Sequence, residues 1–227
     1  MSTKPPPRSD AFTVTAAAAA VRYLATHGYE NSTASDLADA IGMSRSTFFR
    51  RFGSKEDVVF ADHDLALERL ETLLADTDLA PTEAITRGTV EVLHLLIRDA
   101  DAAKQRSELL RHTPSLRERE LVITHRYERV FASYLARAAE PGTPDWAPIA
   151  LAAGLVAVHN AALRQWLRDA HADARTFGAL ERDLSDLTAR FAPWFGGERH
   201  PSKVLVAAFN ADASPEEVLR EVRAQLL

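Results

Sequence analysis

The sequence contains no cysteine, which excludes disulfide bonds, cysteine-ligated metal sites and cysteine nucleophiles. It also lacks a Gly-rich phosphate loop, a Gly-x-Ser-x-Gly motif and a His-Glu-x-x-His motif. Glu91 and His94 form one Glu-x-x-His, whereas a di-iron bundle needs two such motifs and two further glutamates. We therefore expect no enzyme activity, no metal site and no cofactor.

Long apolar runs are missing as well. The segment AAAAAV is too short to cross a bilayer, and APIALAAGLVAVHNAAL is interrupted by His159 and Asn160. The first ten residues, MSTKPPPRSD, contain no apolar stretch of the kind found in signal peptides. We expect a soluble, cytoplasmic protein that does not bind membranes.

Glycine and proline are scarce, with 9 and 11 residues in a chain of 227, and Ala, Leu, Arg and Glu dominate. This composition favours helix, so we predict an all-α fold. The net charge of −5 is unevenly spread, because residues 1–62 hold seven basic and seven acidic side chains, against 20 basic and 25 acidic in residues 63–227. Such asymmetry suggests two parts with different functions, although any solvated helical surface fluctuates in this way.

Capping residues and breaks predict where the helices begin and end. Thr33 is a good N-cap with Asp36 three residues later, and Gly42 ends the helix that follows. Ser44 and Ser54 cap the next two helices, the second of which we expect to continue unbroken to about Ala75. The expected helices cover residues 11–27, 34–41, 45–52, 55–75, 81–100, 102–112, 115–139, 147–170 and 176–194.

Residues 43–55 contain four basic side chains and no acidic one, although the protein as a whole is acidic. They belong to two short helices joined by a turn at Gly42, which is a helix-turn-helix arrangement. The second helix of such a motif places its first side chains on base edges in the major groove of DNA. A helix-turn-helix that does not contact DNA is the alternative.

The side chains at the start of this second helix suit DNA recognition. Arg45, Ser46 and Thr47 are placed to reach base edges. Phosphates can be held by Ser44, Thr47 and Lys55, together with backbone N–H groups at the helix start. Phe48 and Phe52 are four residues apart on one face and should pack the helix onto its neighbours.

The stretch HGYENSTASDLADAIGMSRSTFFRRFGSKEDVV closely resembles the N-terminal domain of TetR-family transcriptional regulators. That family typically shows Gly-Tyr, then Thr-x-x-x-Ile/Leu-Ala, a Gly-Val-Ser turn, and Thr-Leu-Tyr-x-x-Phe-x-Ser-Lys-Glu. The matching residues are Gly28-Tyr29, Thr33, Leu37-Ala38, Gly42-Met43-Ser44, Thr47-Phe48-Phe49, Phe52 and Ser54-Lys55-Glu56.

The resemblance implies that the recognition helix and the start of the helix before it contact DNA. Lys55 matches the phosphate-binding lysine of the family. Phe49 stands where the family usually has a tyrosine whose hydroxyl contacts a phosphate, so this contact is lost or reduced to packing. Arg50 and Arg51 occupy variable positions and could supply compensating charge. The implied DNA-binding residues are Thr33, Ser35, Ser44, Arg45, Ser46, Thr47, Phe49, Arg50, Arg51 and Lys55.

The later part of the chain resembles, more loosely, the acyl-CoA-like ligand-binding domain of the TetR subgroup that includes mycofactocin-type regulators. The matching features are a Leu-x-x-x-Thr-Pro-x-Leu-x-x-Arg run over residues 109–119 and Ala-Leu-Arg-x-Trp-Leu over residues 162–167. The resemblance implies a ligand with a long apolar part and an anionic or polar head. The candidate ligand-binding residues are Arg111, His112, Tyr127, His159, Asn160, Arg164 and Trp166, with Arg119 as a further partner for the head.

Several of these candidates have a structural role as the alternative. Trp166 is more often a core residue, and Arg119 lies among glutamates that favour a solvated face. His159 and Asn160 are polar in an apolar helix, and they face either a ligand or hydrogen-bond partners across a dimer interface.

Together these observations predict four parts: a disordered arm (1–10), a helix-turn-helix domain (11–62), a helical ligand-binding and dimerisation domain (63–200) and an extension with a short amphipathic helix (201–227). The role of the extension stays open. We expect a homodimer, joined through helices near 147–170 and 176–194, that represses from a palindromic double-stranded DNA operator and is released by a small effector. The alternative is a helical enzyme or ligand-binding protein without a specific DNA target.

Overall fold

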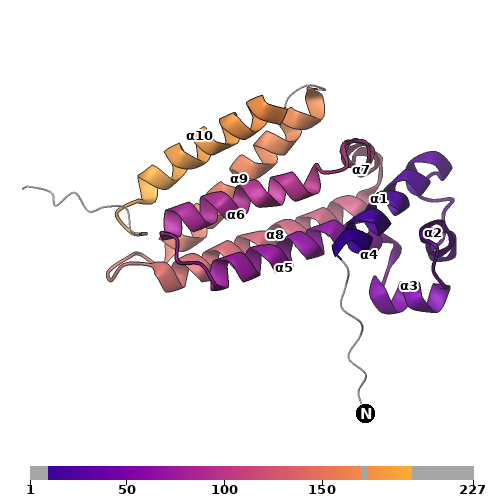
Figure 1. Ribbon diagram of the computed structural model, residues 1–227, viewed down its shortest axis with the longest axis horizontal. Coiled ribbons are helices and arrows are strands. Elements are labelled where there is room, and N and C mark those ends of the chain that lie inside the picture. Colours follow the sequence, from indigo (N-terminus) through magenta and orange to yellow (C-terminus); the bar gives the residue numbers. More distant parts are fainter. Residues whose placement is uncertain (1–9, 170–172, 196–227) are drawn as a thin grey trace, which may run out of the picture. The chain divides into compact units, whose positions relative to one another are not determined.

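The computed structural model describes residues 10–169 and 173–195. These residues form ten α-helices and no β-strand, which confirms the predicted all-α fold (Figure 1). The extension predicted over 201–227 lies outside the described residues, as does nearly all of the arm. The helices are α1 (Asp10–His27), α2 (Ala34–Ile41), α3 (Arg45–Arg51), α4 (Lys55–Val59), α5 (Ala61–Ala75), α6 (Pro81–Leu96), α7 (Ala100–His112), α8 (Pro114–Ala138), α9 (Trp146–Arg168) and α10 (Asp173–Phe191).

The helices α1 to α4 form the N-terminal domain, and local capping fixes the ends of α2 and α3. Thr33 and Asp36 make a reciprocal capping box at the start of α2, as the sequence predicts. Gly42 follows α2 with φ +78°, a left-handed conformation that only glycine adopts without strain, and its N–H bonds back to the helix. The core of this domain includes Phe48, Leu24 and Leu37, which are all fully buried.

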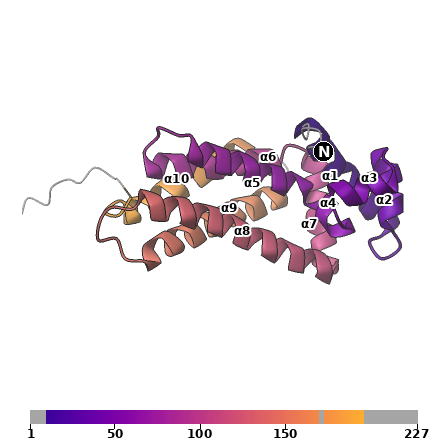
Figure 2. The same ribbon diagram turned by 90° about the horizontal axis from the view of Figure 1, so that it is seen from below.

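The remaining helices form a bundle in which α9 lies between α8 and α10, and α5 lies against α6 and α8 (Figure 2). The shorter α7 packs against α1 as well as against α8 and α9, so it touches both domains. Close approach of α5 and α6 depends on Gly88, where an added Cβ would lie 2.5 Å from Cδ1 of Leu70. The bundle therefore has narrow sections and, next to α7, room for a cavity.

One helix does not follow the sequence prediction. The helix that begins after Ser54 is not continuous to Ala75, because α4 ends at Val59 and α5 begins at Ala61. Between them Phe60 has φ −111° and ψ 16°. No glycine or proline breaks the chain here, and the cause is tertiary packing. The Phe60 ring is buried beside the guanidinium of Arg106, at 5.9 Å, and the ring of His63, at 5.5 Å.

Several further boundaries shift by a few residues, and α10 spans Asp173–Phe191 instead of the expected 176–194. The helix expected over 81–100 ends at Leu96, and α7 begins at Ala100, earlier than expected. The cause is local, because the Asp99 side chain accepts a hydrogen bond of 3.0 Å from the N–H of Ala102 and so caps α7.

Among the described helices only α9 is long and apolar enough to cross a membrane. Of its most apolar stretch, 44% is buried inside the protein, and α9 packs against both α8 and α10. These contacts are those of a core helix in a soluble bundle.

Candidate DNA-binding surface and ligand cavity

The start of α3 presents a cluster of hydroxyl groups. The Ser44 side chain accepts a hydrogen bond of 3.2 Å from the N–H of Thr47 and so caps the helix. Its Oγ also lies 3.1 Å from Oγ of Ser46 and 2.9 Å from Oγ1 of Thr47. Three hydroxyls therefore converge at one positively polarised helix end.

Arg45 and Phe49 stand together on the outer face of α3. The Arg45 guanidinium lies 5.6 Å from the centre of the Phe49 ring, within the range of a cation–π contact. Phe49 is 42% exposed, whereas its neighbour Phe48 is completely buried and anchors the helix. Arg50 is also exposed. The outer face thus carries two arginines and one aromatic ring.

Arg51 takes a different position from the other basic residues of this stretch. Its guanidinium lies 4.3 Å from the centre of the Phe12 ring and donates a hydrogen bond of 3.4 Å to Oγ1 of Thr13. Both partners belong to α1, so Arg51 ties α3 to α1.

Lys55 is also partly used within the protein. Its Nζ donates to the carbonyl oxygens of Tyr29, at 2.8 Å, and Ser32, at 3.1 Å, and it lies 3.7 Å from the centre of the Tyr29 ring. Because an ammonium group has three donors, one is left for a phosphate. The predicted residues Thr33 and Ser35 flank the start of α2, where Thr33 is exposed and Ser35 half-buried.

A cavity of about 490 Å³ lies among α5, α6, α7, α8 and α9. Five of the predicted ligand-binding residues line it: Arg111, Tyr127, His159, Asn160 and Arg164. The structure does not place the other predicted residues in this lining. His112 is exposed and lies 3.1 Å from a Glu108 oxygen, and Trp166 is buried with the Lys104 ammonium 5.8 Å from its ring.

The cavity has apolar walls and a charged rim. Its apolar walls include Phe60, which precedes α5, and residues of α6 to α9, namely Val92, Leu96, Ala103, Ile123, Phe131 and Val156. Three exposed arginines, Arg111, Arg117 and Arg164, line it from the end of α7, the start of α8 and the later part of α9. Glu120 also lines it, and burial raises the pKa of its carboxyl group.

The inner wall contains polar groups that carry no net charge. Burial lowers the pKa of His63 to about 3 and that of His159 to about 4, so both imidazoles are neutral near pH 7. Burial also raises the pKa of Tyr127 well above its usual value. Arg106 is charged, but its Nη2 lies 2.5 Å from Oδ2 of Asp62 and both side chains are less than 10% exposed.

Sequence reasoning missed Arg106, His63 and Arg117 as parts of this cavity, and Asp62 as the partner of Arg106. The Arg106–Asp62 pair joins residues 44 positions apart in different helices, so no local spacing signals it. Arg117 stands among alternating acidic and basic residues, a pattern typical of a solvated helix face.

Polar contacts connect the start of α8 to the N-terminal domain. Nη2 of Arg119 lies 2.6 Å from Oδ1 of Asp57 in α4. One turn earlier, Oγ of Ser115 donates a hydrogen bond of 3.0 Å to the hydroxyl of Tyr29, which in turn donates to Glu56 of α4. Burial and the Glu56 carboxylate raise the pKa of Tyr29 to about 12, so the phenol stays a donor.

A second polar contact between the two domains lies beside α7. Arg22 of α1 is ion-paired with Asp99, the residue that caps α7. Both α7 and α8, which carry two of the rim arginines, are therefore attached to the DNA-binding domain.

Known proteins resemble this chain in both its helix-turn-helix domain and the domain that holds the cavity. Residues 17–61 match the family model for bacterial regulatory proteins of the tetR family, and residues 79–192 match that for the MftR C-terminal domain. The chain is 26% identical over 155 residues to the putative mycofactocin biosynthesis transcriptional regulator MftR of Mycobacterium tuberculosis, covering 66% of this chain and 77% of that protein.

Solved structures show the same fold at low sequence identity. FadR of Bacillus subtilis in complex with stearoyl-CoA superposes with a TM-score of 0.54 and 17% identity, covering 78% of this chain and 96% of that one. The SmeT–triclosan complex has a TM-score of 0.54 and 18% identity, with 90% and 99% covered.

The family models match both the helix-turn-helix domain and the domain that holds the cavity. The alternatives of a helical enzyme or a binding protein without a DNA target are not favoured. The chain therefore belongs to the TetR family of bacterial regulatory proteins, with a C-terminal domain of the MftR type, and is a DNA-binding transcriptional regulator.

Proposed function

We propose that this regulator is a cytoplasmic repressor, which leaves a palindromic operator when an amphipathic, acyl-CoA-like effector occupies the cavity. The observation that carries this proposal is the combination of apolar walls with three arginines at one rim. An acyl chain suits the walls, and the phosphates of coenzyme A suit the guanidinium groups. The stearoyl-CoA present in the FadR structure of the same fold supports this ligand class.

On the DNA side, the proposed contacts follow from exposure and position. Arg45 and Ser46 stand at the exposed start of α3, where a recognition helix meets base edges. Lys55, with one donor left over, and the hydroxyl cluster at Ser44 are placed for phosphates. Arg51 contributes mainly by holding α3 against α1.

The proposed dimer uses α9 and α10. As far as Ala161, the exposed positions of α9 are Trp146, Ile149, Ala150, Ala153, Ala157 and Ala161, and the polar residues Arg164, Gln165 and Arg168 are exposed beyond them. The spacing of three and four residues from Trp146 to Ala161 makes one continuous apolar stripe, and small side chains allow a close approach of helices. A twofold partner on this stripe would place two α3 helices on half-sites about 34–36 Å apart or a multiple of that distance.

The proposed switch acts through the start of α8. A coenzyme A headgroup bound at Arg117 would shift the first turns of α8, which also carry Ser115 and Arg119. Those two side chains hold the α1–α2 loop and α4. Ligand binding would thereby favour a spacing of the two recognition helices that does not fit successive major grooves.

The test is fluorescence anisotropy of the full chain on duplex DNA from upstream of its own gene, with a scrambled duplex as control and a series of salt concentrations. We expect preferential binding to the upstream duplex that falls steeply with salt, and release on addition of stearoyl-CoA. Binding that stearoyl-CoA and shorter acyl-CoAs leave unchanged would contradict the effector class. Equal binding to both duplexes at every salt concentration would contradict an operator in that region.

A further inference from the structure

His159 presents a hydrogen-bond acceptor that the protein does not use. The side chain is 9% exposed and lines the cavity. Its Nδ1 lies 3.3 Å from Oδ1 of Asn160, and its Nε2 has no partner in the described part of the protein. Because Oδ1 is an acceptor, the neutral imidazole carries its proton on Nδ1, which leaves a lone pair on Nε2.

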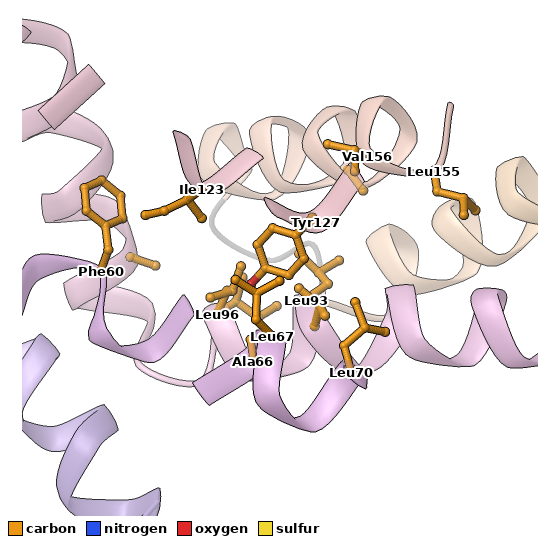
Figure 3. Packing of buried hydrophobic residues seen from close by; sticks show 14 of the residues in the cluster. Phe60, Ala66, Leu67, Leu70, Leu93, Leu96, Ile123, Tyr127, Leu155 and Val156 are labelled. Carbon is orange, nitrogen blue, oxygen red and sulfur yellow. The ribbon is translucent and has the colours of Figure 1, made fainter. Parts of the chain in front are cut away.

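Arg106 adds an unused donor to the same cavity. Its Nη2 is bound to Asp62, but its buried Nε–H has no partner among the described residues. The Tyr127 hydroxyl is held only by long contacts to His63, 3.3 Å to the carbonyl oxygen and 3.5 Å to Nδ1. Figure 3 shows Tyr127 beside apolar side chains of α5 and α6, among them Leu67 and Leu96. The inner wall thus has unsatisfied hydrogen-bonding capacity within apolar surroundings.

A saturated acyl chain offers no hydrogen-bond partner to Nε2 of His159 or to the Nε–H of Arg106, both of which are enclosed and unpaired among the described residues. Buried polar groups without partners are rare and destabilising, so a chain of this kind fits the inner wall poorly. An anionic group fits it poorly as well, because Asp62 already balances the charge of Arg106 and both histidines are neutral. A neutral group that both donates and accepts is complementary to a wall with an unused acceptor and an unused donor.

We infer that the effector carries a hydroxyl group within its apolar part, which donates to Nε2 of His159 and accepts from Arg106 or Tyr127. The inference rests on the proposed function, since it refines the effector class from acyl-CoA-like to hydroxylated acyl-CoA-like. The arginines at the rim bind the headgroup, and His159 distinguishes hydroxylated chains from saturated chains.

The experiment compares stearoyl-CoA with positional isomers of hydroxystearoyl-CoA in isothermal titrations against the full chain. At least one isomer should bind about 10-fold more tightly than stearoyl-CoA, as expected for one added hydrogen bond to a buried partner. His159→Leu should abolish this preference, and His159→Gln, which keeps an acceptor, should retain part of it. Thr89→Val is the matched control, because Thr89 lines the cavity but its hydroxyl is already bonded to the Ile85 carbonyl at 2.7 Å.

The outcomes separate the two proposals. If stearoyl-CoA binds as tightly as every isomer and releases DNA, the hydroxyl inference is wrong and the proposed function stands. The hydroxyl inference is equally wrong if thermally stable His159→Leu keeps the preference. If neither class of ligand binds, both proposals fall. A preference that His159→Leu removes and Thr89→Val retains would establish the inference.

Discussion

Arg119 in the second turn of α8 and Asp57 in the first turn of α4 form an ion pair of 2.6 Å between the ligand-binding domain and the DNA-binding domain. Both side chains are partly shielded from solvent. In the proposed switch, this contact passes a displacement of α8 to α4, the helix that follows the recognition helix.

Arg119→Ala should therefore uncouple the two domains without unfolding either. A partly exposed ion pair contributes less than about 1 kcal/mol, so the free energy of unfolding should change little. Operator affinity in the absence of ligand should stay within about 3-fold of wild type, while the release caused by acyl-CoA should be reduced. Anisotropy titrations with and without ligand measure both quantities. Arg87→Ala, which removes an exposed ion pair to Glu91 inside α6, is the control and should release normally.

The buried pair of Arg106 and Asp62 should matter far more for stability. Asp62→Asn leaves a buried guanidinium without its counter-charge, which costs about 3–5 kcal/mol in comparable cases. In urea unfolding experiments, the midpoint concentration of urea and the free energy of unfolding should both be lower for Asp62→Asn than for wild type. A loss below about 1 kcal/mol would mean that water reaches Arg106 and that the inner cavity is wetter than the structure shows.

Phe49 stands where the TetR family usually has a tyrosine, so a substitution at this position can restore the phenol hydroxyl. Phe49→Tyr should strengthen binding to operator and scrambled duplexes by a similar factor, about 3- to 10-fold, because a phosphate contact carries no sequence information. A gain on the operator alone would indicate a base contact and contradict this assignment.

Replacing Arg45 and replacing Lys55 should weaken DNA binding in different ways. Arg45→Ala should cost about 1–3 kcal/mol on the operator and relax base preference, since an arginine at this position reads bases. Lys55→Ala should weaken all duplexes alike and lower the salt slope by about 1. It should also lower stability, because Nζ holds two carbonyl oxygens of the α1–α2 loop. Equal losses on both duplexes for both variants would exclude a base contact by Arg45.

His159 should make the fold sensitive to mild acid. Its pKa is about 4 in the folded protein and about 6.5 when unfolded, so between these values the unfolded chain binds more protons. The contribution of His159 to the free energy of unfolding is fully present above pH 6.5 and is lost as the pH drops toward 4. At pH 5 the free energy of unfolding should be lower by about 2 kcal/mol. Urea unfolding at pH 7.5 and pH 5 should show a smaller difference for His159→Leu than for wild type. His63, with its lower pKa, adds a loss of the same sign.

Features fixed by neighbours in sequence are predictable from it. The capping residues Thr33, Ser44 and Ser54 and the turn at Gly42 act over three or four positions, and the structure confirms all of them. The all-α fold also follows, because helical periodicity and the scarcity of glycine and proline are properties of each segment.

Features fixed by distant partners are not predictable in this way. Arg119 looks like one member of an alternating charged face, and only the folded chain brings it to Asp57. Arg111, Tyr127, His159, Asn160 and Arg164 line the cavity, but the resemblance selects them together with His112 and Trp166, which the structure places elsewhere. Local patterns indicate the residue types of a pocket, whereas burial and helix rotation decide which of them face it.

The interruption at Phe60 has a mechanical consequence. A single stiff rod from Ser54 to Ala75 would carry any tilt at its far end straight to the recognition helix, as a lever does. Because the helix is interrupted at Phe60, α4 and α5 do not form one rigid rod, and a tilt of α5 need not turn α4 by the same angle. Asp57 and Tyr29 precede Phe60 in the chain. The first turns of α8, which contact both residues, therefore bear on α4 and the α1–α2 loop directly and not through α5.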